Sequence, residues 1–210
     1  MNFPLQLQKI AFREGPVELF VPEVAAIKEA YRKEQIAFPF WSRVWPAAKA
    51  LTQFLLTNSF YTERKTVLEI GAGLGLPSLA AARNASSVLC TDSSAAAVQV
   101  IAQSAIHGAL SNVTTAVLDW RHLPKDLAAD VLLLSDINYE PEAFPVLQKM
   151  LDHFLQKGTT ILLSTPQRLM AKAFILALLP YCIKQEELLV KEENETVAVT
   201  VMVLRKEGKT

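Results

Sequence analysis

The stretch TVLEIGAGLGLPSLAAA, Thr66 to Ala82, contains the pattern that decides the fold of this chain. An apolar run ends near an acidic residue, glycines follow at alternate positions, and an alanine-rich segment comes next. Glycines after a strand let the backbone approach a ligand closely, and the helix that follows offers unpaired N–H groups. We therefore expect a strand, a glycine loop and a helix from Leu76, arranged to hold a nucleotide-like ligand.

The spacing of the glycines favours one kind of ligand over another. Gly71, Gly73 and Gly75 have the spacing G-x-G-x-G. A dinucleotide loop has G-x-G-x-x-G, with its third glycine where this chain has Leu76. The acidic Glu69 would repel a pyrophosphate and would suit a ligand with a cationic amine, such as S-adenosylmethionine. A dinucleotide loop and an ordinary structural glycine turn stay open as alternatives.

Apolar runs alternate with helical segments from Thr66 onward. Nearly continuous apolar strands separated by helices are typical of a parallel sheet that is covered on both faces. Near the end, two apolar runs surround the polar turn 192–195, so the last strand is expected to run antiparallel. The predicted fold class is α/β, with a Rossmann-like, doubly wound and mostly parallel sheet.

The first sixty residues follow a different pattern. Alternating runs on both sides of Glu14-Gly15-Pro16 predict a hairpin, residues 23–35 have helical periodicity, and Pro46 suits the first position of a helix. We expect one domain over residues 1–210. Within it, residues 1–60 form an N-terminal hairpin and helix appendage, and residues 61–210 form the Rossmann-like core.

The composition argues against several classes of partner. The chain has 210 residues, with 21 basic and 21 acidic side chains and a net charge of zero. Phosphate binding depends on clustered Lys and Arg, so nucleic acid is not expected as the main partner. The first residues do not resemble a signal peptide, and the most apolar segment, 174–183, is too short to span a bilayer. We expect a cytoplasmic monomer with no membrane partner, two reduced cysteines and no metal.

Acidic residues end the next two predicted strands. Asp92 is placed to accept hydrogen bonds from both hydroxyls of a ribose, or else to cap the following helix. Asp119 could accept a hydrogen bond from an adenine amino group while Trp120 covers the ring. The alternative is a loop aspartate beside a half-buried tryptophan. NAD and S-adenosylmethionine share the ribose, so Asp92 does not distinguish them.

The fourth predicted strand ends in Ser135-Asp136-Ile137-Asn138-Tyr139. In a doubly wound sheet, the carboxyl ends of the first and fourth strands flank the point where the strand order reverses, and ligands bind there. The topology therefore places Asp136 where chemistry is expected. Tyr139 either faces the same place or packs on the next helix.

Four segments, taken together and in order, resemble one family. They are VWPAAKAL at 44–51, LEIGAGLGL at 68–76, LDW at 118–120 and DINY at 136–139. The chain resembles class I, seven-β-strand S-adenosylmethionine-dependent methyltransferases, and more narrowly methyltransferase family 16, whose members mostly modify protein lysines. The resemblance covers roughly residues 38–168 and implies a seven-stranded sheet.

The resemblance also implies a role for each matching residue. S-adenosylmethionine would be the cofactor, and the acceptor would be a lysine side chain of a protein substrate. The implied cofactor-binding residues are Trp45, Glu69, Gly71 and Gly73 near the methionine part, Asp92 at the ribose, Asp119 and Trp120 at the adenine, and Ser135 through its backbone. The implied catalytic residues, which would face the acceptor, are Asp136 and Tyr139.

Several readings of the function stay open beside this one. PFWSRVWP is similar to the branch that acts on the electron-transfer flavoprotein β-subunit, but the turn TPQR at 165–168 departs from that branch. A small-molecule or other protein N-methyltransferase would have the same fold. An NAD-dependent oxidoreductase is disfavoured by the missing third glycine. A non-catalytic cofactor-binding protein is disfavoured by the presence of Asp136 and Tyr139.

Overall fold

The computed structural model describes residues 3–34 and 39–206. The chain begins with an antiparallel hairpin of β1 (Leu5–Ile10) and β2 (Val17–Pro22), followed by helix α1 (Val24–Glu34). The hairpin turns through Gly15, whose φ of +114° suits a residue without Cβ. Both elements agree with the sequence pattern, although the last residue of the expected helix, Gln35, lies outside the described residues.

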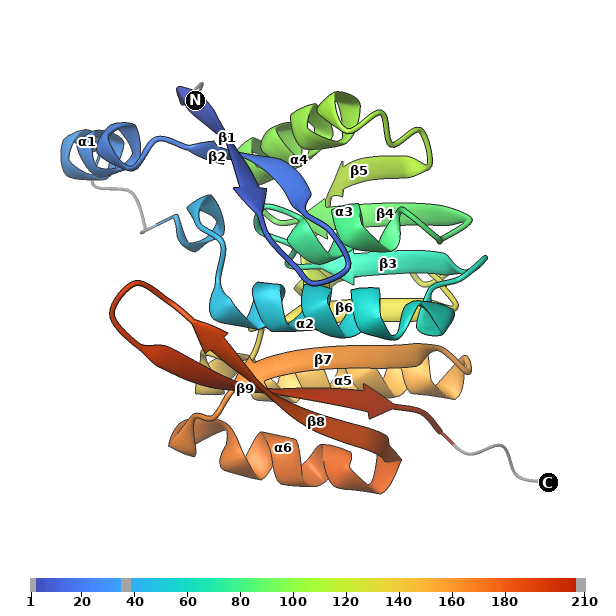
Figure 1. Ribbon diagram of the computed structural model, residues 1–210. Helices are drawn as coiled ribbons and strands as arrows, with labels where there is room; N and C mark the ends of the chain where they lie inside the picture. The colour runs from blue at the N-terminus through green and yellow to red at the C-terminus, as the bar shows by residue number, and fades with distance from the viewer. Residues whose placement is uncertain (1–2, 35–38, 207–210) are drawn as a thin grey trace.

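A seven-stranded sheet forms the centre of the molecule (Figure 1). Its strands are β3 (Thr66–Ile70), β4 (Ser87–Asp92), β5 (Val113–Val117), β6 (Val131–Ser135), β7 (Thr160–Pro166), β8 (Cys182–Lys191) and β9 (Thr196–Leu204). They are arranged in the order β5-β4-β3-β6-β7-β9-β8. Strands β3 to β7 pair in parallel, and β9 runs antiparallel between β7 and β8. The predicted Rossmann-like sheet with an antiparallel last strand is confirmed.

The strand order reverses beside β3. The chain runs outward from β3 to β4 and β5, and then returns to place β6 on the other side of β3. The helices that follow β3 and β6 therefore leave the sheet in opposite directions, which opens a crevice at the carboxyl ends of these two strands. The residues expected to bind a ligand follow these strand ends.

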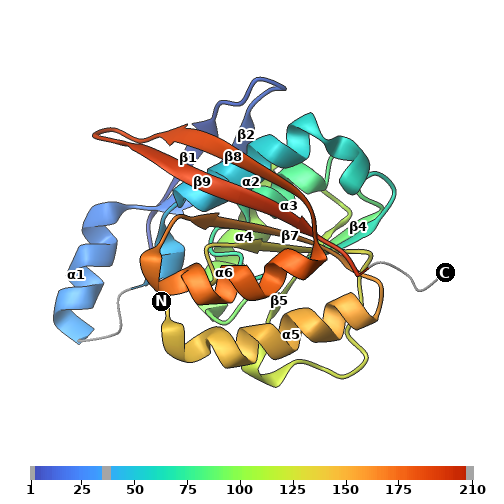
Figure 2. The same ribbon diagram turned by 90° about the horizontal axis from the view of Figure 1, so that it is seen from below.

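Helices cover both faces of the sheet (Figure 2). On one face lie α2 (Pro46–Thr57), α3 (Leu76–Ala81) and α4 (Ala95–His107), and on the other lie α5 (Phe144–Gln156) and α6 (Lys172–Leu178). Successive side chains of β3 point to opposite faces of the sheet, which explains the two helical layers. Val67 belongs to the hydrophobic cluster that includes α2, and Leu68 belongs to the one that includes α5. The loop between β5 and β6 contains only a short 3-10 helix, Trp120–His122.

Helix α2 packs against the central sheet, although the sequence pattern predicted it as part of the appendage. It begins at Pro46, as predicted, and buries Leu51 and Phe54 against the sheet residues Val67 and Leu133. The boundary expected near residue 60 therefore does not separate two packing layers. This position also places the start of α2 at the edge of the sheet where the strands end.

Within the described residues, no helix combines the length and the apolar composition that a membrane crossing requires.

Candidate active site

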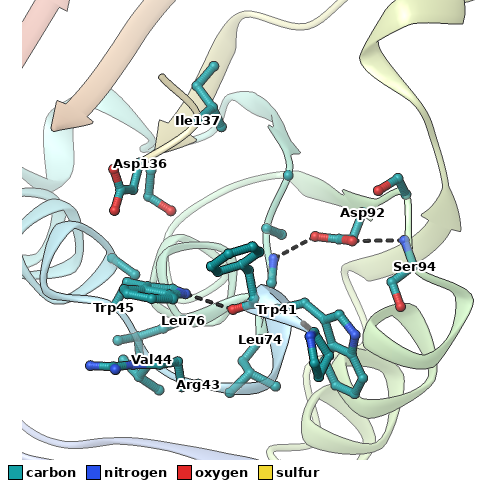
Figure 3. A pocket seen from close by; sticks show the side chains of 18 of the residues that line it. Trp41, Arg43, Val44, Trp45, Leu74, Leu76, Asp92, Ser94, Asp136 and Ile137 are labelled. Atoms are coloured by element: carbon teal, nitrogen blue, oxygen red, sulfur yellow. Dashed lines mark hydrogen bonds between the residues drawn. The ribbon is translucent and has the colours of Figure 1, made fainter. Parts of the chain in front are cut away.

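A cavity of about 510 Å³ opens where the strand order reverses (Figure 3). It is lined by residues from the carboxyl ends of the central strands and by the segment that precedes α2. Of the ten predicted site residues, eight line it: Trp45, Gly71, Gly73, Asp92, Trp120, Ser135, Asp136 and Tyr139. The two others, Glu69 and Asp119, do not line it. The fold thus gathers residues that are up to 94 positions apart in the sequence, from Trp45 to Tyr139.

The glycine loop between β3 and α3 forms one wall of the cavity. Gly71, Gly73 and Gly75 all have positive φ angles, of +67°, +58° and +72°. A Cβ at Gly71 would lie 3.1 Å from the Trp120 ring and 3.2 Å from Ile137, which both line the cavity. Gly71 therefore lets these two side chains close against the loop, and the alternate spacing of the glycines follows from the backbone conformation.

Asp92 joins the glycine loop to the start of α4. Its two carboxylate oxygens accept hydrogen bonds from the backbone N–H groups of Gly73 at 2.9 Å and Ser94 at 2.8 Å. Ser94, and not Asp92, caps α4, so the capping role considered for Asp92 falls to its neighbour. Burial raises the pKa of the Asp92 carboxyl. An ionised carboxylate has about four lone-pair sites, so two acceptor positions remain for hydroxyl groups in the cavity.

Glu69 lies behind the glycine loop and is fully buried. Its Oε2 accepts the backbone N–H of Ser78 in the first turn of α3, at 3.0 Å, while Oε1 has no hydrogen-bond partner. Burial raises the pKa of Glu69 to about 8, and the nearby Asp92 adds to this rise. Glu69 does not line the cavity, and its predicted contact with a ligand stays a prediction. A protonated carboxyl that holds the start of α3 is what the surroundings favour.

Asp119 and Trp120 both follow the end of β5, and their side chains point to different surroundings. The Trp120 side chain lines the cavity beside Gly71. The Asp119 side chain turns away and accepts hydrogen bonds from the backbone N–H and the guanidinium Nε of Arg121, both at 3.0 Å. This pairing with Arg121 lowers the pKa of the Asp119 carboxyl. Asp119 also caps the short 3-10 helix Trp120–His122, and its predicted contact with an adenine amino group stays a prediction.

Asp136 faces the cavity from the end of β6, opposite Asp92 in the view of Figure 3. Its backbone has a φ of +57°, and its N–H donates to the Ser164 carbonyl of β7 at 2.9 Å. Its carboxylate accepts one N–H from each terminal nitrogen of Arg168, with Nη2 at 2.9 Å from Oδ2. Asp136 is therefore held as one half of an ion pair.

Aromatic side chains gather on the same side of the cavity. The Phe40 ring centroid lies 5.7 Å from that of Tyr139 and 6.2 Å from that of Trp45, and the Trp45 indole N–H donates to the Phe40 carbonyl at 2.7 Å. Arg43 stacks over Trp45 at 4.3 Å. Burial and the charges of Glu140, Asp92 and Asp136 raise the pKa of the Tyr139 phenol, so it stays protonated at neutral pH. Tyr139 can therefore donate a hydrogen bond or form a wall, but it is a poor base.

Two charged residues of the cavity, Arg43 and Arg168, were not predicted from the sequence. Arg168 comes two residues after β7, which lies next to β6 in the sheet. Residues that directly follow central parallel strands lie at the edge where ligands bind, and this rule could have identified it. Arg43 gave no comparable signal, because it lies in an irregular segment before α2.

Among the described residues, no cluster of His, Cys, Asp and Glu side chains could hold a metal ion.

The chain is similar in sequence to several methyltransferases. A histone-arginine methyltransferase of Mus musculus is 30% identical over 168 residues, which are 73% of this chain and 62% of the relative. A protein N-lysine methyltransferase of Xenopus tropicalis is 29% identical over 71% of this chain and 69% of its own length. An electron transfer flavoprotein beta subunit lysine methyltransferase of Rattus norvegicus is 30% identical over 62% of this chain. The matched part spans about 55–62% of the histone-arginine relatives from mouse, human and rat.

Solved structures share the fold. The N-methyltransferase NodS of Bradyrhizobium japonicum, in complex with S-adenosyl-L-homocysteine, superimposes with a TM-score of 0.63 at 13% identity. That match covers 86% of this chain and 98% of NodS. The sequence profile of a family described as lysine methyltransferase matches residues 27–179, which is more than half of the chain. The chain therefore belongs to the lysine methyltransferase family.

Proposed function

We propose that the chain transfers a methyl group from S-adenosylmethionine to a lysine side chain of a protein. The observation that carries the proposal is the single cavity that joins an adenosine-type site around Asp92 and Trp120 to an acceptor-type site around Asp136 and Tyr139. The glycine loop lies between the two sites. A methyl donor bound along the loop would have its reacting end near the second site.

The residues present fit S-adenosylmethionine. A volume of about 510 Å³ is within the range of about 300–1,000 Å³ for small-molecule sites. Asp92 keeps acceptor capacity for two ribose hydroxyls, and Trp120 provides an apolar face for an adenine ring. When bound, this cofactor supplies a methyl group on a positively charged sulfur, which keeps the bonding electron pair as the methyl leaves.

The start of α3 suits a dinucleotide poorly. A pyrophosphate binds at a helix N-terminus through free backbone N–H groups. Here Pro77 has no N–H, and the N–H of Ser78 is already bound to Glu69. Helix α3 also has only six residues, so its dipole is weak. These features favour a cofactor without a pyrophosphate and disfavour the NAD-dependent alternative.

On the acceptor side, the chain's own residues orient a nitrogen and exclude water. Positioning is the main contribution to a displacement of this kind, since the reacting atoms must approach to about 3–3.5 Å in line. Asp136 can accept a hydrogen bond from the acceptor nitrogen. The rings of Phe40, Trp45 and Tyr139 would stabilise the positive charge that passes between sulfur and nitrogen. The lysine ammonium loses one proton to solvent before transfer, because only the neutral amine has a lone pair for the methyl group.

An arginine acceptor is the second candidate, because several relatives are named histone-arginine methyltransferases. Lysine is favoured by the family description and by relatives named as lysine methyltransferases.

We also propose that the protein is a monomer and lies in the cytoplasm. Cys90 and Cys182 are free thiols, which suits a reducing compartment, and light scattering together with cell fractionation would test both statements.

The proposal is tested in two steps. S-adenosyl-L-homocysteine should raise the melting temperature, with a stabilisation of about 2.7 kcal/mol at one hundred times its dissociation constant. NAD should leave the melting temperature unchanged. Incubation with radiolabelled S-adenosylmethionine and a cell extract, followed by mass spectrometry of the labelled protein, should identify the acceptor. Stabilisation by NAD alone would contradict the proposal, and so would an extract that gains no label.

A further inference from the structure

Arg168 and Asp136 form an ion pair within the acceptor part of the cavity. Both side chains line the cavity, and the pair is sheltered, with 28% of the Arg168 side chain and 9% of the Asp136 side chain exposed. Two N–H groups of the guanidinium face the two carboxylate oxygens, one on each. Such parallel pairing fixes the relative orientation of both groups and is stronger than a single contact.

The backbone holds the carboxylate in this orientation. Asp136 has a φ of +57°, and its N–H is bound to the Ser164 carbonyl of the neighbouring strand β7. Arg168 follows the carboxyl end of that same strand. The parallel pairing of β6 with β7 therefore brings the Arg168 guanidinium and the Asp136 carboxylate together.

This pairing limits what an acceptor can form with Asp136. A carboxylate has one edge on which a guanidinium can make two parallel hydrogen bonds, and Arg168 occupies it. The remaining lone pairs can each accept a single N–H, which is enough for an amine. A guanidinium acceptor could not form two parallel hydrogen bonds with Asp136, and the negative charge of Asp136 is already balanced by Arg168.

The positive charge of Arg168 also disfavours a guanidinium acceptor. Both acceptors approach as cations at neutral pH, but a guanidinium stays charged in proteins, so an arginine acceptor would remain a cation beside the cation of Arg168. A lysine acceptor must lose its proton before it reacts, because an ammonium has no lone pair. The neutral amine that results is not repelled by Arg168.

We propose that Arg168 is a specificity-determining residue, which restricts the acceptor to an amine and excludes a guanidinium. The inference rests on the proposed methyl transfer and adds to it the residue that decides between the two acceptor classes. If Arg168 is removed, the edge of Asp136 becomes free, and a guanidinium acceptor can occupy the place that the Arg168 guanidinium leaves.

The first test compares the wild type, Arg168→Ala and Arg205→Ala. Arg205 is a matched control, since it also donates two N–H groups to β7, but to Thr160 at the opposite end of that strand. Each protein is incubated with radiolabelled S-adenosylmethionine and a cell extract, and the labelled proteins are hydrolysed to amino acids. For the wild type and Arg205→Ala, we expect at least tenfold more label in methyl-lysine than in methyl-arginine. Arg168→Ala should lower this ratio at least tenfold.

The second test measures binding without any transfer. n-Butylguanidine should raise the melting temperature of Arg168→Ala but not that of the wild type or Arg205→Ala, because only the first has a free carboxylate edge. If Arg168→Ala does not unfold cooperatively, Arg168→Gln replaces it, since it removes the charge and keeps one donor. A purely structural role of Arg168 would not produce a selective response to guanidine.

The outcomes separate the inference from the proposed function. A wild-type ratio of methyl-lysine to methyl-arginine below ten, or an unchanged ratio in Arg168→Ala, would overturn the role of Arg168 and leave methyl transfer standing. Equal stabilisation of all three proteins by n-butylguanidine would also overturn it. A wild type that labels neither residue would overturn the proposed function, and the inference with it.

Discussion

The Asp92 carboxylate accepts the backbone N–H of Gly73 at 2.9 Å, which ties the end of β4 to the glycine loop that follows β3. A second hydrogen bond, from the Ser94 N–H at 2.8 Å, ties the same carboxylate to the start of α4. One side chain thus fixes the two loops that flank the cavity. The arrangement places a buried acceptor at the cavity wall, and its effects on binding and on folding can be measured together.

Asp92→Ala should weaken the binding of S-adenosyl-L-homocysteine at least tenfold. The change removes an acceptor for two ribose hydroxyls, and each hydrogen bond to a charged group contributes about 1.5–3 kcal/mol. The variant should also lose stability, because the N–H groups of Gly73 and Ser94 lose their partner. Calorimetry and chemical denaturation measure the two effects, with the exposed Asp126→Ala as control. An unchanged affinity would mean that Asp92 only supports the loops.

Gly71→Ala and Gly158→Ala form a matched pair. Both glycines have positive φ, +67° and +81°, so each alanine costs about 1–2 kcal/mol in backbone strain. A Cβ at Gly71 would also meet Trp120 at 3.1 Å, whereas a Cβ at Gly158 would meet nothing within 4 Å. We expect both variants to lose stability by denaturation, but only Gly71→Ala to lose cofactor affinity by calorimetry. Equal affinities would refute a role of this contact in shaping the cavity.

Glu69→Gln should change how stability depends on pH. Burial raises the pKa of Glu69 from 4.5 to about 8, so between these values the folded protein holds a proton that the unfolded chain has lost. The wild type therefore loses stability as pH rises through this window, by about 1.4 kcal/mol per pH unit for one proton. The raised pKa of Asp92 acts in the same direction, and it persists in the variant.

Glutamine resembles the protonated carboxyl and does not titrate. Glu69→Gln should match the wild type near pH 5 and become more stable than it near pH 8, as followed by thermal unfolding at both values. If the wild type and the variant lost stability in parallel from pH 5 to pH 8, the prediction would be wrong. The Glu69 carboxyl would then be ionised in the folded protein.

Asp119→Ala tests the adenine contact. If the carboxylate leaves Arg121 and accepts from the adenine amino group, the wild type should bind S-adenosyl-L-homocysteine more tightly than its inosine analogue, which lacks that amino group. The variant should lose this preference. Calorimetry with both ligands decides, and a preference that persists in the variant would leave Asp119 as a loop residue paired with Arg121.

Asp136→Asn separates binding from transfer. Asparagine tolerates the φ of +57°, so the backbone should be kept while the charge that pairs with Arg168 is lost. Cofactor affinity should change little, and methyl transfer should fall by roughly a hundredfold, the scale expected from lost positioning. Tyr139→Phe, in which the ring remains, should stay within about tenfold of the wild type. Normal turnover in Asp136→Asn would remove the assigned role.

Local sequence patterns were enough to predict the strands, the helices and the edge of the sheet at which the site lies. Apolar runs of strand length, Pro46 at a helix start and glycines at alternate positions are local signals, and each produced the expected element. The rule that ligands bind where strand order reverses then placed Asp92 and Asp136 near each other without any knowledge of contacts.

The surroundings of these side chains could not be predicted in the same way, because they depend on long-range packing. Glu69 and Asp119 occupy strand ends, as Asp92 and Asp136 do, yet the fold turns one onto the start of α3 and the other onto Arg121. Arg168 is distant from Asp136 in the sequence, and parallel pairing of β6 with β7 brings the two together. Local periodicity specifies the backbone direction at a strand end, whereas the direction of a side chain depends on neighbours from other segments, which only packing assembles.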